Sequence, residues 1–157
     1  MPTTRNDLPD NTRKAMIALL NARLADTIDL RLSLKQSHWN IKGPTFIALH
    51  ELFDQIQARV DTFADDIAER AMQLGGYANG ALQMVAKTTN LKPYPTDVSD
   101  EKEHLKLVSD HLAAYGKLAR AAIDAADEAG DKDTADLFTS VSRSIDKDLW
   151  FVESHLQ

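Results

Sequence analysis

Apolar residues recur every three or four positions over four long stretches of this chain, the period expected of α-helices with one buried face. The clearest stretch lies between Pro44 and the pair Gly75–Gly76. Proline suits the first turn of a helix because it needs no N–H there and its φ is already helical. Glycine suits a left-handed C-terminal cap. The apolar stripe of this helix comprises Phe46, Leu49, Phe53, Ile56, Val60, Phe63, Ile67 and Leu74.

The same periodicity predicts three further helices. The first begins near Asn11 or Thr12 and continues to about Ser37, with the stripe Ile17, Leu20, Leu24, Ile28 and Leu32. The third begins at Ser99 and ends before Gly130, with the stripe Leu105, Val108, Leu112, Tyr115, Ala119, Ala122 and Ala126. The fourth begins near residues 131–133, with the stripe Leu137, Val141, Ile145, Leu149, Val152 and Leu156.

Two connections of different length set the expected topology. The link over residues 39–43 is short, so the first two helices are predicted to be antiparallel neighbours. The connection from Gly76 to about Val98 is long, so we expect it to contain an element of its own or to cross the bundle. Its apolar piece Ala81–Ala86 is interpreted as a short helix lying across the bundle. The predicted fold class is all-α: a ferritin-like four-helix bundle with a short extra helix in the long connection between helices 2 and 3. Residues 1–10 form a short polar N-terminal segment and residues 11–157 a single domain.

Composition narrows the class of protein. The chain has 157 residues, a net charge of −6 and no cysteine, which excludes disulfides and thiolate metal sites. No apolar run approaches the roughly 20 residues that a membrane span needs, and the N-terminus has no apolar signal core. We therefore expect a cytoplasmic protein without a membrane partner, with association with the nucleoid left open. The negative charge favours attraction of cations over non-specific attraction of nucleic acid.

A polar face runs beside the apolar stripe of the second predicted helix. At about 100° per residue, His50, Asp54, Asp65 and Glu69 all lie on the same side of that stripe. His50 and Asp54 are an i,i+4 pair, as are Asp65 and Glu69, so the side chains within each pair are neighbours. One histidine with three carboxylates is a ligand set suited to iron or manganese and tolerable for zinc. The alternative is a solvated face with helix-stabilising pairs.

The spacing of the two pairs indicates a dimer. His50 and Glu69 are separated by about 28 Å along a straight helix, so one helix cannot bring both pairs to one ion. A second copy lying antiparallel across a twofold axis places 50 opposite 69 and 54 opposite 65, because both pairs of residue numbers add to 119. The axis passes near Arg59 and Val60, and a homodimer of this kind has two identical sites. His38, at the end of the preceding helix, is placed to join the same site.

These residues resemble the Dps family, the ferritin-like mini-ferritins of bacteria. The matching motifs are HWN at 38–40, KGP at 42–44, FIALHELFD at 46–54 and DDIAERAMQLGG at 65–76. The resemblance extends through LKPYPTD at 91–97, DKDTADLF at 131–138 and SRSIDKDLWFVES at 142–154, which is nearly the whole chain. It implies a ferroxidase site between subunits, with His38, His50 and Asp54 from one chain and Asp65 and Glu69 from the other.

The resemblance also implies an assembly and a reaction. Twelve identical subunits are expected to form a hollow shell that takes up Fe²⁺, oxidises it and stores Fe³⁺ as a mineral. Family members usually prefer hydrogen peroxide to oxygen, so iron and peroxide are the expected substrates. Two-electron reduction of peroxide at paired irons would release no hydroxyl radical, which explains how such a protein protects DNA and the cell from oxidative damage.

Several other residues have a plain interpretation beside a functional one. Trp39 either packs at the subunit interface or serves as an electron donor near the iron, and the sequence does not separate these roles. Glu101 and His104 have the E-x-x-H spacing of di-iron sites inside one bundle, which need two such motifs and two further glutamates. Because the second motif is missing, these two residues are assigned to a solvated helix start, and His111 and His155 to the same kind of exposed position.

An acidic run lies at the turn between the last two predicted helices. Its plain interpretation is a charged turn with aspartates that cap a helix. In proteins that the chain resembles, this segment lines a threefold pore that admits Fe²⁺, and a ring of carboxylates concentrates cations. Asp131, Asp133 and Asp136 are the candidate pore residues.

Two alternative functions belong to other classes. One is a DNA-binding, nucleoid-compacting protein whose iron oxidation is secondary, and the other is a purely structural helical oligomer. Phosphate binding requires several Lys or Arg side chains. The first fifteen residues hold only Arg5, Arg13 and Lys14 as cations, offset by Asp7 and Asp10. Weak or absent DNA binding is therefore predicted.

Overall fold

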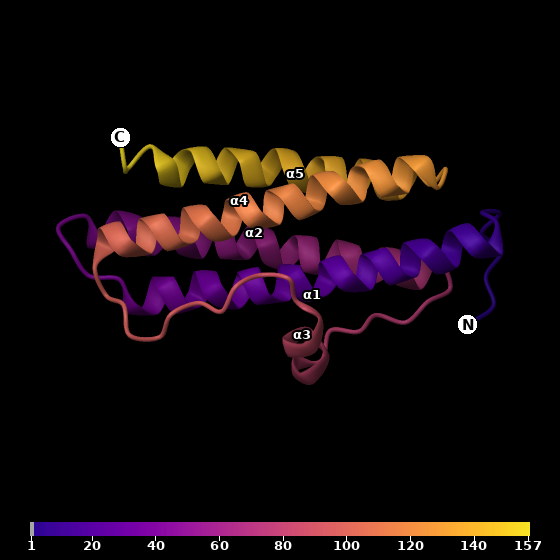
Figure 1. Cartoon of the computed structure of the whole chain (residues 1–157), viewed down its shortest axis with the longest axis horizontal. Helices are drawn as coiled ribbons and strands as arrows, with labels where there is room; N and C mark the ends of the chain where they lie inside the picture. The colour runs from indigo at the N-terminus through magenta and orange to yellow at the C-terminus, as the bar shows by residue number, and fades with distance from the viewer. Residues whose placement is uncertain (1) are drawn as a thin grey trace.

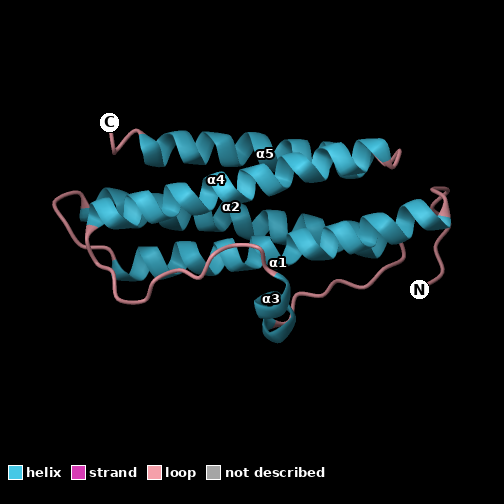
Figure 2. Ribbon diagram, in the orientation of Figure 1, coloured by secondary structure: helices cyan, strands magenta, loops and turns pink. Residues whose placement is uncertain are grey.

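The computed structural model describes residues 2–157, which fold into four long helices and one short helix (Figures 1 and 2). The helices are α1 (Asp10–Asn40), α2 (Phe46–Gln73), α3 (Leu82–Thr88), α4 (Glu101–Glu128) and α5 (Lys132–Glu153). α1 and α2 run antiparallel, as do α4 and α5, and the connection from α2 to α4 returns along the length of the bundle. α3 lies in this connection, on the outside of the bundle against α1. The expected four-helix bundle with one short extra helix is confirmed.

The junction between α1 and α2 differs from the sequence prediction. α1 continues to Asn40, three residues beyond Ser37, so His38 and Trp39 lie in its last turn. α2 begins at Phe46, and the prediction that Pro44 opens this helix is wrong. The reason is a carboxylate from α4: the backbone N–H and the hydroxyl of Thr45 both donate to Glu101, at 2.9 and 2.8 Å. Glu101, half-buried at the first position of α4, therefore also contacts the start of α2.

The other helix ends follow local chemistry closely. Gly75 has a φ of +83°, the left-handed conformation expected of it, and the N–H of Gly76 donates to the carbonyl of Ala71 at 2.9 Å. These are the features of a glycine cap. α4 is capped by Asp100 and not by Ser99, because the Asp100 carboxylate accepts from the N–H groups of residues 102 and 103.

The buried faces of the helices form two adjoining core clusters, and half-buried Phe63 and Leu137 pack against both. All seven residues of the predicted α4 stripe are buried. On α2 the stripe is buried from Leu49 onward except for half-buried Phe63, whereas Phe46, at the first position of the helix, is 41% exposed. Leu32 and Leu156 are exposed although the pattern predicted them buried, since Leu30 and Leu34 occupy the inner side of α1 and Leu156 lies beyond the end of α5.

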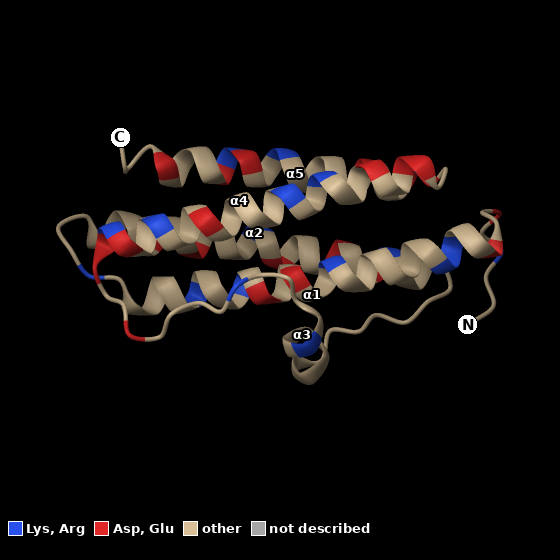
Figure 3. Ribbon diagram, in the orientation of Figure 1, with Lys and Arg blue, Asp and Glu red and all other residues tan. Residues whose placement is uncertain are grey.

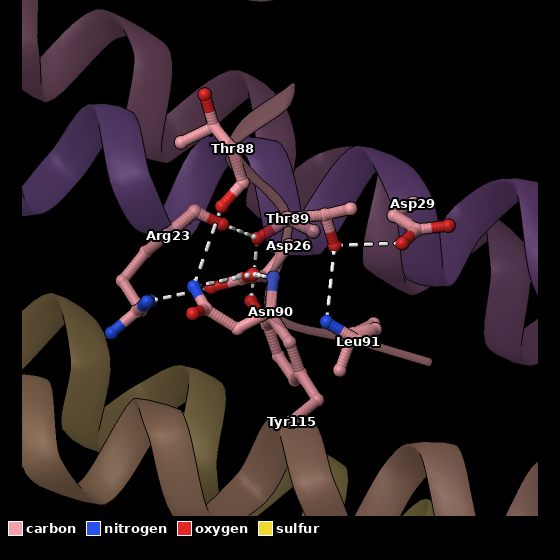
Figure 4. A network of polar contacts seen from close by, with 9 residues as sticks. Arg23, Asp26, Asp29, Thr88, Thr89, Asn90, Leu91 and Tyr115 are labelled. Atoms are coloured by element: carbon pink, nitrogen blue, oxygen red, sulfur yellow. Dashed lines mark hydrogen bonds and ion pairs between the residues drawn. The ribbon is translucent and has the colours of Figure 1, made fainter. Parts of the chain in front are cut away.

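A buried polar network attaches the long connection to α1 (Figure 4). Asp26 is fully buried and accepts from Arg23 at 2.7 Å and from the backbone N–H of Asn90 at 2.6 Å. Beside it, Thr27 forms a 2.7 Å hydrogen bond with the hydroxyl of Tyr115, and burial raises the pKa of that hydroxyl. A buried carboxylate requires such partners, so this network sets where the connection crosses α1.

Two histidines of α4 hold the second half of the connection. His104 is fully buried, and its Nε2–H donates to the carbonyl of Val98 at 3.0 Å while Nδ1 accepts from the Tyr94 hydroxyl at 2.8 Å. Burial lowers the pKa of His104. His111 is also buried and lies 3.0 Å from the carbonyl of Lys92. The prediction that both are exposed is wrong because the connection covers this face of α4. His155 is exposed, as predicted.

Charged residues of both signs are interspersed along the long helices (Figure 3). Ion pairs join neighbouring helices, including Arg120 with Asp146 between α4 and α5 and Arg59 with buried Asp148 between α2 and α5. Among the helices of residues 2–157, none has both the length and the apolar character that crossing a bilayer requires.

Candidate metal centre

The candidate centre is built around two histidines that face each other across the junction of α1 and α2. His38 lies in the last turn of α1 and His50 in the second turn of α2, and the short junction between these helices brings them together. Their rings stack with centroids 3.6 Å apart and an angle of 18° between the planes. The ring of Phe46 lies 5.0 Å from that of His50, so this side of the pair is apolar.

Each histidine is fixed by the backbone of the other. Nδ1 of His38 lies 2.6 Å from the carbonyl of His50, and Nδ1 of His50 lies 2.7 Å from the carbonyl of His38. A carbonyl oxygen only accepts hydrogen bonds, so both Nδ1 atoms carry the hydrogen. In the neutral ring the lone pair is then on Nε2, which is a common metal-ligating atom. Each ring is thus oriented by a backbone carbonyl, as metal-binding histidines usually are.

Asp54 lies one turn beyond His50 on α2 and forms an ion pair with Lys35 of α1. The hydrogen bond from the Lys35 ammonium is the main cause that lowers the pKa of Asp54, and the charges of His38 and His50 act in the same direction. The carboxylate is therefore ionised at neutral pH and is occupied by the Lys35 ammonium. Sequence analysis missed Lys35. Lys35 lies three residues before His38 and therefore on the same face of α1. That spacing alone could have predicted that Lys35 lies near the candidate site.

Asp65 and Glu69 lie farther along α2, and both side chains are exposed. Neither has a hydrogen bond or ion pair to any other side chain between residues 2 and 157. One described chain places His38, His50 and Asp54 around the same surface pocket, but not close enough to hold one ion, and leaves Asp65 and Glu69 apart from them. Consistently, residues 2–157 contain no cluster of three or more His, Asp or Glu close enough to hold one ion.

The other candidates have different surroundings. Trp39 is 66% exposed beside the histidine pair. Asp131 is buried, accepts from the backbone N–H of Thr134 at 3.1 Å and pairs with Arg70 at 2.8 Å. Its carboxylate caps α5 and neutralises a buried guanidinium, so the prediction that it lines a pore is wrong. Asp133 and Asp136 are exposed on the first turns of α5.

The four-helix bundle and its lengthwise crossover define the ferritin-like class. Residues 17–157 match the ferritin-like domain family. The chain is 51% identical over 154 residues to the DNA protection during starvation protein of Agrobacterium fabrum, covering 98% of this chain and 95% of that protein. Within the ferritin-like class, this chain belongs to the Dps family.

Solved structures agree with that assignment. DpsC from Streptomyces coelicolor superposes with a TM-score of 0.94 at 32% identity, covering 99% of this chain and 91% of that one. A Dps protein from Vibrio cholerae superposes with a TM-score of 0.92 at 25% identity, covering 100% of this chain and 98% of that one. The latter is described as a member of a broad superfamily of ferritin-like diiron-carboxylate proteins.

Proposed function

We propose that this protein is a ferroxidase and iron store: it binds Fe²⁺ at sites shared between two chains, oxidises it with hydrogen peroxide and retains Fe³⁺ in a hollow twelve-subunit shell. The observation that carries the proposal is the reciprocal bonding of His38 and His50. It leaves the Nε2 atoms of both rings as potential ligands, on two residues that line the same surface pocket as Asp54. A polar face that only contacts solvent does not require two histidines whose Nδ1 atoms are both held by backbone carbonyls.

The remaining ligands come from a second copy of α2 lying antiparallel to the first. Asp65 and Glu69 are exposed and have no side-chain partner within residues 2–157, which suits residues that act across an interface. The half around His50 carries two histidines and a carboxylate paired with Lys35, whereas the half around Glu69 carries two carboxylates. A twofold axis brings these unlike halves together twice.

The chemistry follows from the ligand types. The histidine nitrogens hold Fe²⁺, while carboxylates, which are harder ligands, favour Fe³⁺ and can bridge two ions. Two Fe²⁺ ions each give one electron to one hydrogen peroxide molecule. The O–O bond breaks, two protons are taken up, and two water molecules and two Fe³⁺ ions result. Asp54 joins this site when a cation replaces the Lys35 ammonium on its carboxylate.

Binding of DNA has a minor place in this proposal. Arg13 is engaged within the subunit, where it donates to the carbonyls of Leu8 and Leu74 and pairs with Asp10. This leaves Arg5 and Lys14 as the nearby cations of the N-terminal segment, too few for strong phosphate binding. A gel shift at neutral pH and about 0.1 M salt, where electrostatic contacts are only partly screened, should show no retarded complex. Clear retardation at micromolar protein would favour the nucleoid-compacting alternative.

The test of the proposed function is Fe²⁺ binding without oxygen, followed by optical measurement of oxidation after adding peroxide or oxygen. The variant Asp65→Ala should lose at least tenfold in initial rate, since it removes a ligand. Asp66→Ala is the matched control: its carboxylate is also exposed but points about 100° further round α2, so its rate should be unchanged. Equal rates in both variants and the wild type, or an absence of Fe²⁺ binding, would refute the proposal.

A further inference from the structure

Large apolar side chains are exposed at only three positions of α2, all of which the structure describes. Phe46 is 41% exposed, Ile47 61% and Met72 48%. Phe46 contacts the ring of His50, but no such contact accounts for Ile47 and Met72. Both lie on the face that carries His50 and Glu69, and their numbers add to 119, the sum that pairs His50 with Glu69 and Asp54 with Asp65.

We propose that Ile47 of each chain packs against Met72 of the partner subunit and closes the outer end of each iron site. The inference rests on the antiparallel pairing of α2 in the proposed function. In that pairing the Ile47–Met72 contact lies about 4.5 Å, or three residues of helical rise, outside the His50–Glu69 pair. Phe46 extends the same apolar wall over the His50 ring.

The contact makes one end of each site apolar and leaves the other end polar. An apolar contact excludes water, and ligand charges interact more strongly where water is excluded. Toward the twofold axis the same face is polar, because Asp61 is exposed there and pairs with Arg31 of α1. The apolar contact therefore closes the histidine end of each site, and the other end faces the polar part of the interface.

A second copy of this chain is the partner that fits both residues at once. Ile47 and Met72 are about 37 Å apart along α2, so they do not form one patch for a small partner. Between them the same face carries His50 and Asp54 toward Ile47, and Asp65 and Glu69 toward Met72. An inverted copy places Ile47 opposite Met72 and His50 opposite Glu69 at both ends of the contact.

Cross-linking tests the contact directly, because the chain has no cysteine of its own. In the double variant Ile47→Cys, Met72→Cys, a short bis-maleimide should link two chains in most of the protein. Either single variant should link little, since its two copies lie about 37 Å apart in the same dimer. Failure of the double variant to cross-link, or equal cross-linking by a single variant, would overturn the proposal.

A charge variant gives a second measure. Ile47→Asp should raise the dissociation constant of the dimer at least tenfold, and adding Met72→Lys in the same chain should recover most of that loss. An equal loss in the combined variant would also overturn the contact. Fe²⁺ oxidation by the wild-type protein is recorded in parallel to separate the two proposals. Cross-linking of the double variant with no oxidation by the wild type supports the contact and refutes the ferroxidase function, whereas wild-type oxidation that needs His50 and Glu69 without cross-linking refutes the contact alone.

Discussion

Mixing two inactive variants tests whether each iron site is shared between chains. His50→Ala removes a ligand from one half-site and Glu69→Ala from the other, about 28 Å away along α2. After equal amounts are dissociated and reassembled together, about half of the dimers contain one chain of each kind. In such a dimer one site carries both lesions and the other carries none. About a quarter of all sites should therefore be intact.

The assay is the initial rate of Fe²⁺ oxidation per chain, compared with wild-type protein taken through the same dissociation and reassembly. The mixture should recover about 25% of the wild-type rate, because each intact site contributes to the rate independently. A matched mixture of wild type with the double variant, His50→Ala and Glu69→Ala in one chain, should also give about a quarter, whereas sites within single chains would give about half. A mixture of the single variants that stays inactive would refute the shared site.

Three further predictions concern stability. Asp26→Ala should lower the free energy of unfolding, measured by urea denaturation, by about 3 kcal/mol, since it leaves Arg23 buried without its partner. The control Asp29→Ala, at a half-buried position, should lower it by about 1 kcal/mol or less. Lys35→Met should raise the pKa of Asp54 toward its ordinary value, seen by NMR titration. The variant should be less stable than the wild type at neutral pH. This difference should disappear as the pH falls through the pKa of Asp54 in the folded wild type, because Asp54 is then protonated in both the variant and the wild type. Burial lowers the pKa of His104, so this histidine binds a proton more readily in the unfolded chain than in the folded one. The free energy of unfolding of the wild type should therefore fall from pH 7 to pH 5, and it should fall less steeply in His104→Asn.

The pattern of apolar residues was sufficient to predict the architecture. The four long helices, the short helix in the connection and the glycine cap at Gly75 all depend on neighbours close in sequence. The stripe of α4 was predicted completely because every residue from Leu105 to Ala126 at that spacing faces the core. The i,i+4 relation of His50 and Asp54 is also local, so it could be read without a structure.

The errors occurred where a distant segment changes the surroundings of a residue. His104 and His111 looked exposed on a helix surface, but residues 91–98 cover them. Pro44 looked like a helix start, but the carboxylate of Glu101, far along the chain, fixes Thr45 outside the helix. Asp131 has the sequence context of a surface acid, but it is buried because it pairs with Arg70, far along the chain.

By itself the sequence determined the helices, their order and the residue types of the candidate site, because helical period and spacing act over a few residues. Only the tertiary structure decided which nitrogen of His38 and His50 is free, because that depends on two backbone carbonyls from opposite sides of the α1–α2 junction. It also decided that Asp54 is held ionised by Lys35, since that ion pair forms only when α1 and α2 lie antiparallel. Contacts between segments far apart in sequence arise from packing, and periodicity along one helix does not record them.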